Sequence, residues 1–84
     1  MSNLLSDHKE SQHYAYNRSW DDMETMLARA ERVRNTWETK FIDNKINGKK
    51  KEAIKCARNM KALEGVIKTL KWTLGDKDIP HPLV

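Results

Sequence analysis

The sequence predicts an all-α protein in which two long helices form an antiparallel hairpin. Only three glycines and two prolines interrupt the 84 residues, and 33% of the residues are charged, a composition that favours helices. An apolar heptad pattern occupies the second half of the chain, and an amphipathic pattern occupies the first half. The turn-forming stretch NKING, residues 44–48, separates the two patterns.

A chain of this length can form one small domain. We divide it into an N-terminal arm (1–18), a helical hairpin (19–75) and a C-terminal tail (76–84). No apolar run approaches the roughly 20 residues that a bilayer-spanning helix needs, so no membrane association is expected. The first residues lack the pattern of a secretion signal, and the single Cys56 cannot form an internal disulfide. A cytoplasmic location is therefore expected.

The first 18 residues are polar and lack a sustained period, which predicts a flexible arm whose order depends on a partner. Tyr14 and Tyr16, with Arg18 beside them, form an aromatic and basic cluster close to Trp20. Unpaired bases could stack on such rings. Alternatively, the rings could cover the open end of the hairpin.

The first long helix is predicted from Trp20 to about Asn44. Ser19 precedes it with Asp22 three residues later, as in a capping box. Its broad apolar stripe consists of Trp20, Met23, Met26, Leu27, Ala30, Val33, Trp37 and Phe41. Arg34 interrupts this stripe. We expect its side chain either to form a salt bridge with a glutamate across an interface or to extend into solvent.

The second long helix is predicted from the strongest pattern in the chain. Its heptad seam consists of Ala53, Cys56, Met60, Leu63, Ile67, Leu70 and Leu74. Gly75 is expected to end the helix. Pro80 and Pro82 predict an extended tail.

Two helices alone leave one side of each apolar stripe exposed, because helix packing usually needs three or four helices to close a core. We therefore expect either a homodimer that closes into a four-helix bundle, or a hairpin completed by its target. Trp72 lies away from the seam, and partly exposed tryptophans are enriched at protein interfaces. Its position makes it a candidate contact for a protein partner.

The positive charge is concentrated in the second half of the chain. Residues 1–44 contain six Lys/Arg and eight Asp/Glu, whereas residues 45–84 contain ten and four. One face of the second helix, opposite the seam, is predicted to bind nucleic acid, with Arg58 offering a forked set of donors to phosphate. Its basic residues are Lys50, Lys51, Lys55, Arg58, Lys61 and Lys68. The competing interpretation is a solvated lysine face without a ligand.

The sequence gives little indication of a metal site or of a catalytic site. His8, His13 and His81 have no paired Cys/His spacing for zinc, so no metal or cofactor is expected. No nucleophile, base and orienting group can be placed together from their spacing, and a small hairpin offers little enclosed volume. The sequence therefore predicts a protein that is not an enzyme.

The lysine-rich stretch GKKKEAIKCARNMK, residues 48–61, on a short, basic, helical chain resembles the small accessory inhibitors of T-even phages. This resemblance implies a phage anti-defence protein that binds RNA and neutralises the toxin endoribonuclease of a type III toxin-antitoxin system, with RNA bridging the two proteins. The alternative is an anti-host factor that occludes a host enzyme by protein contacts alone. These two functions remain open at the level of the sequence.

Overall fold

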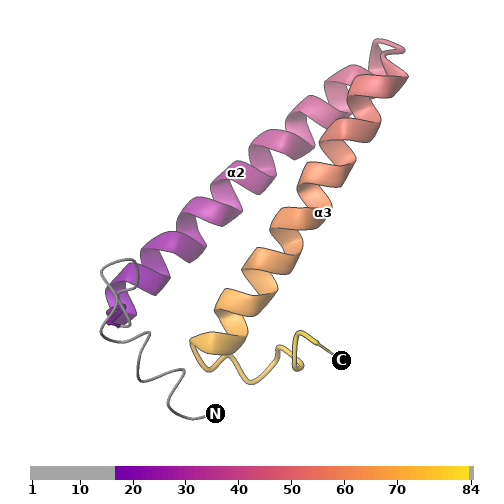
Figure 1. Cartoon of the computed structure of the whole chain (residues 1–84). Coiled ribbons are helices and arrows are strands. Elements are labelled where there is room, and N and C mark those ends of the chain that lie inside the picture. The colour runs from indigo at the N-terminus through magenta and orange to yellow at the C-terminus, as the bar shows by residue number, and fades with distance from the viewer. Residues whose placement is uncertain (1–16, 84) are drawn as a thin grey trace, which may run out of the picture.

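The computed structural model describes residues 17–83, which contain two helices and no strand. Helix α2 spans Trp20–Ile46 and helix α3 spans Lys50–Thr73. They lie antiparallel and side by side (Figure 1), which confirms the predicted all-α hairpin. Within this part of the chain, neither helix combines the length and the apolar character that crossing a bilayer requires.

A capping box starts α2. The Ser19 hydroxyl accepts a hydrogen bond from the backbone N–H of Asp22 at 3.0 Å. In return, the Asp22 carboxylate accepts one from the backbone N–H of Ser19 at 3.2 Å. Asp21 and Asp22 also place negative charge at the positive end of the helix dipole. The predicted start is thus confirmed, and the helix ends at Ile46, two residues beyond the predicted Asn44.

The chain reverses at Asn47 and Gly48. The N–H of Lys49 donates to the carbonyl of Asn44 at 2.8 Å, and the N–H of Asn47 donates to the carbonyl of Asp43 at 3.0 Å. Gly48 has φ 74°, a left-handed conformation that costs other residues energy but not glycine. The reversal predicted from these residues is confirmed.

The core of the hairpin is thin. Among residues 17–83 the buried apolar side chains are Ala30, Ala53 and Cys56, which are 5%, 7% and 4% exposed. The other seam residues of α3 and their counterparts on α2 are only partly covered. No large side chain of the described hairpin is fully buried. Two helices therefore cover only the central line of each apolar stripe.

The predicted stripe on α2 is wider than the surface that α3 covers. Trp20 remains 56% exposed, Met26 51% and Val33 40%. The residues that face α3 recur at alternating steps of four and three along α2 and include a charged residue, Arg34. A broad apolar stripe identifies the inward half of a helix, but a single partner helix can cover only part of that half.

The C-terminal segment is more turned than the extended tail predicted. The Asp76 carboxylate accepts a hydrogen bond from the N–H of Asp78 at 3.0 Å, and the Asp76 carbonyl accepts one from the N–H of Ile79 at 3.3 Å. These bonds bend the chain after α3. The His81 ring then packs edge-on against Trp72, with 4.9 Å between ring centroids.

Candidate nucleic-acid interface

Helix α3 carries most of the positive charge of the hairpin. It contains seven Lys/Arg and two Glu, whereas α2 contains five Lys/Arg and six Asp/Glu. A surface with this imbalance concentrates anions near one helix. The candidate interface is therefore the part of α3 that α2 leaves uncovered.

Five of the six predicted basic residues line the outer surface of α3. The buried Ala53 and Cys56 fix the side of the helix that faces α2, and at about 100° per residue these five cations fall on the remaining arc. We call this surface the basic ridge. It consists of Lys50, Lys51, Lys55, Arg58 and Lys61, all of them exposed.

Few carboxylates lie near the basic ridge. The ion pairs within residues 17–83 are Arg34 with Glu38, Arg34 with Glu64, and Lys61 with Glu64. In the pair of Lys61 with Glu64 the nitrogen and oxygen are 4.0 Å apart, and the Lys61 side chain is 87% exposed. Such an exposed pair contributes little to the stability of the fold. Four of the five ridge cations thus have no ion-pair partner in the described part of the chain. Their charge is available to an external anion.

The amino end of α3 adds to this positive region. Lys49 occupies the cap position and its side chain makes no capping hydrogen bond. The first N–H groups of a helix have no partner within the helix, and the helix dipole adds partial positive charge there. At α2 the same groups meet Ser19 and two aspartates. At α3 they stand beside Lys50 and Lys51, with Glu52 as the acidic residue of the first turn, an arrangement that is less negative than at α2 and favours a bound anion.

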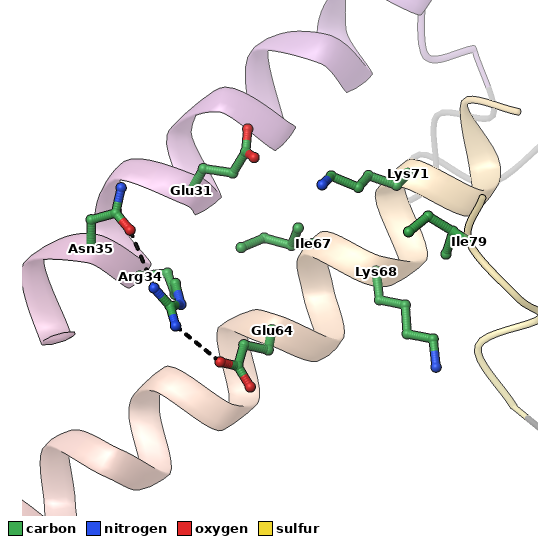
Figure 2. A pocket seen from close by; sticks show the side chains of 8 residues that line it. All are labelled: Glu31, Arg34, Asn35, Glu64, Ile67, Lys68, Lys71 and Ile79. Carbon is green, nitrogen blue, oxygen red and sulfur yellow. Dashed lines mark hydrogen bonds and ion pairs between the residues drawn. The ribbon is translucent and has the colours of Figure 1, made fainter. Parts of the chain in front are cut away.

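Lys68 is set apart from the basic ridge. It is half-buried and lines a hollow together with Ile67, Lys71 and Ile79. Figure 2 shows this stretch of α3 beside Ile79 of the C-terminal segment. The turned tail thus lies next to Lys68. Of the six predicted basic residues, Lys68 is the one whose surroundings include a second segment of the chain.

Arg34 is engaged inside the hairpin. Its guanidinium donates to the Glu64 carboxylate on α3 at 3.2 Å and pairs with Glu38 one turn along α2; Figure 2 shows the bond to Glu64. The hydrogen bond with Glu64, reinforced by Glu38, raises the pKa of Arg34 above its ordinary value. Of the two expectations for Arg34, the ion pair across a helix interface is the one observed, and the partner belongs to the same chain.

The other predicted contact residues do not join the basic ridge. Tyr14 and Tyr16 lie outside the described residues. Arg18 lines a hollow with Met26 and Leu70, near the start of α2 and far from the turn (Figure 1). Trp72 is 44% exposed near the carboxyl end of α3, where His81 covers part of its ring. Arg18 and Trp72 are therefore at the end of the hairpin opposite the turn where the ridge begins.

Two further cations lie near the turn, of which Lys49 belongs to the lysine-rich stretch 48–61 and Lys45 precedes it. Lys45 and Lys49 are exposed and flank the turn that leads into the ridge. Lys45 also lies over the Phe41 ring, 5.8 Å from its centroid. The charge run NKINGKKK contains both residues, but they lie outside the helix face from which the candidate site is predicted.

The described residues contain no cluster of three His, Cys, Asp or Glu side chains that could hold a metal ion. No protein-family model, curated protein or solved structure matches the chain.

Proposed function

We propose that this chain is a small RNA-binding inhibitor that neutralises a host toxin endoribonuclease of a type III toxin-antitoxin system, with RNA in the complex. The observation that carries the RNA part is the basic ridge, whose cations are exposed and mostly without ion pairs in the described residues. In this proposal the protein acts in the host cytoplasm, as a homodimer, and catalyses no reaction itself.

The form of the ridge suits a phosphate backbone. Lys51, Lys55 and Arg58 succeed one another at about one helical turn, and all three are exposed. Flexible lysines act as point charges that can follow successive phosphates, and an arginine can offer two parallel donors. Such contacts fix position without reading sequence, so the proposed binding is largely independent of base identity.

The inhibition of a toxin is proposed from the resemblance to the small inhibitors of T-even phages, among them TifA, the antagonist of the ToxN toxin. In that interpretation the ridge holds RNA that the ribonuclease also binds. The inhibitor then needs no active site of its own, because it works by holding the enzyme and its RNA in an unproductive complex.

Salt-dependent binding to single-stranded RNA tests the proposal. About five phosphate contacts predict that the binding constant falls with salt at a log-log slope near −3.5. Reversing Lys51, Lys55 and Arg58 to glutamate should abolish binding while helix content stays unchanged. Reversing Arg29, Arg32 and Lys40 changes the net charge equally and should weaken binding far less, because all three lie on α2 and not on the ridge. A flat salt response, or equal losses in both triple variants, would refute the RNA proposal.

A second candidate is an anti-host factor that occludes a host enzyme by protein contacts alone. The favouring observation is Trp72, whose ring is 44% exposed on a helix surface, as at many binding hot spots. In this case Trp72→Ala should reduce partner binding more than the triple reversal on the ridge. Arg34 contributes less than its place in the stripe suggested, because its donors already meet Glu38 and Glu64.

A further inference from the structure

Both helices contribute to a shallow apolar groove on one side of the hairpin. The groove consists of three adjoining hollows. Met26 lines all three of them, and Val66 and Leu70 each line two. We call this surface the apolar groove and define it by Met26, Val33, Leu63, Val66 and Leu70. Met26, Val33 and Val66 are among the large apolar side chains that the hairpin leaves exposed.

The apolar groove occupies only part of the hairpin. On α2 its lining runs from Asp22 to Val33, which is about 16 Å of helix, and on α3 it runs from Ala62 to Leu70, about 12 Å. Pro82 of the C-terminal segment also contributes to the lining. A groove of this length suits a short segment, such as three or four turns of a helix, better than a whole domain.

The charged residues that line the apolar groove are mostly cations. Arg18 and Arg29 belong to the α2 side and Lys68 to the α3 side, where it also borders the hollow of Figure 2. Helix α2 contains six Asp/Glu and five Lys/Arg, yet Asp22 is the acidic residue that it contributes to the lining. The Asp22 carboxylate already accepts the N–H of Ser19. The edges of the groove are therefore positive, although α2 as a whole is not.

The cations at these edges have no acidic partner in the described part of the chain. The ion pairs within residues 17–83 do not involve Arg18, Arg29 or Lys68. Arg34, in the hollow of Figure 2, is instead paired with two glutamates. An apolar centre with unpaired cations on both edges is complementary to a segment that has an aliphatic face flanked by carboxylates.

The lining of the apolar groove favours a protein segment over RNA. Unpaired bases bind proteins by stacking on aromatic rings, but no aromatic residue of the described chain lines these hollows. The flexible side chain of Met26, at the centre, can adapt to the aliphatic side chains of a partner. No residue of the basic ridge lines the groove either.

We propose that the apolar groove binds an acidic amphipathic helix of a partner protein. Aliphatic side chains spaced three and four residues apart on that helix pack against Met26, Val66 and Leu70. Its Asp and Glu side chains meet Arg29 on one edge and Lys68 on the other. This contact goes beyond the proposed RNA binding and does not depend on it, because the two surfaces share no residue.

Three labelled synthetic peptides of about 15 residues test the proposal with the full chain. The first carries leucines along one helical face and glutamates along the other. The second has lysines in place of the glutamates, and the third has serines in place of the leucines. In fluorescence anisotropy, the first should bind about tenfold more tightly than either control, because it alone offers both the carboxylates and the apolar face.

Matched substitutions locate the contact. Arg29 and Arg32 are both exposed on α2, but of the two only Arg29 lines the groove. Arg29→Glu should weaken binding of the acidic peptide about tenfold, and Arg32→Glu less than about threefold. On α3, Val66 and Ile54 are 38% and 45% exposed, and of these only Val66 lines the groove. Val66→Ser should weaken binding about tenfold, and Ile54→Ser less than about threefold.

Several results would overturn the proposal. Equal binding of the acidic peptide and either control peptide, or equal losses within both matched pairs, would show that the groove is not the contact. Displacement of the peptide by single-stranded RNA would assign the groove to nucleic acid. Absence of binding would mean that the groove has another occupant, such as a second copy or residues 1–16. Circular dichroism checks that each variant is folded, and the exposed Arg29 pair decides the result if Val66→Ser is not. Peptide binding without RNA binding would refute only the RNA proposal.

Discussion

Gly65 is a residue whose cost to the fold can be measured directly. It lies inside α3 on the outer side, where a Cβ atom would meet nothing within 4 Å, and it does not have the positive φ of the two turn glycines. Alanine there should raise the free energy of unfolding by about 1 kcal/mol, because glycine is the poorer helix former. Urea denaturation followed by circular dichroism measures this change.

Gly48 is the natural control for that substitution. Its φ of 74° places any side chain in the left-handed region, so Gly48→Ala should lower the free energy of unfolding by about 1–2 kcal/mol. The two alanine substitutions thus have opposite expected signs in one protein. A destabilised Gly65→Ala variant would contradict the structure, because it would mean that another surface packs against position 65.

At the scale of the helix, the lysines at the start of α3 oppose the helix dipole. Lys51→Glu should raise the free energy of unfolding by about 0.5 kcal/mol, because it reverses this unfavourable charge and adds a favourable pairing with Lys55 four residues on. The same change should weaken RNA binding. Thermal denaturation and an RNA titration at fixed salt would measure the two effects separately.

Arg58→Glu is the comparison for Lys51→Glu. Arg58 belongs to the basic ridge but lies beyond the first turn of α3, where the helix dipole has little effect. The Arg58→Glu variant should bind RNA more weakly, and its free energy of unfolding should not rise through the helix dipole. If Lys51→Glu were more stable and bound RNA as before, the start of α3 would be excluded from the interface.

The helices and their connection could be predicted because their signals are local. Ser19 with Asp22, Asn47 with Gly48, and the heptad seam each involve neighbouring residues, and each is observed in the structure. The width of the covered surface could not be predicted. Met26 and Val33 follow the same period as the buried Ala30, and only the number of partner helices decides which of them are covered.

The parts of the candidate site that depended on distant contacts were harder to predict. Most of the ridge followed from helical periodicity, but Lys68 also lies near Ile79, which no local pattern indicates. The contact between Trp72 and His81 is likewise made by a turn of the tail. For Arg34 the sequence left an ion pair with a glutamate and extension into solvent both open, and it did not identify Glu64 as the partner across the hairpin.

At the scale of the whole molecule, the candidate contacts separate into two ends. The ridge begins at the turn, whereas Arg18 and Trp72 lie toward the ends of the helices that are far from it (Figure 1). RNA bound along the ridge would therefore leave the other end of the hairpin free. The charge of the basic ridge acts over roughly 8–10 Å at physiological salt, so its attraction for RNA does not extend to that end.

A capture experiment from host cells follows from this arrangement. If RNA joins the inhibitor to its ribonuclease, the ribonuclease should copurify with the chain and should be lost after the RNA is digested. Chain carrying the triple reversal on the ridge should fail to capture it even before digestion. Capture that survives digestion and the triple reversal, but is lost in Trp72→Ala, would instead support the direct protein contact.

The ion pairs of Arg34 have a consequence for the alignment of the two helices. The residues one turn to either side of Glu64 on α3 are Met60 and Lys61, and Ile67 and Lys68. If α3 slid along α2 by one turn in either direction, Arg34 would lose its bond to Glu64 and meet an apolar residue or a lysine, neither of which can pair with it. Apolar seams repeat and tolerate such sliding, whereas this single charged position penalises it in both directions. Arg34 thus selects one alignment among several that the apolar residues alone would allow.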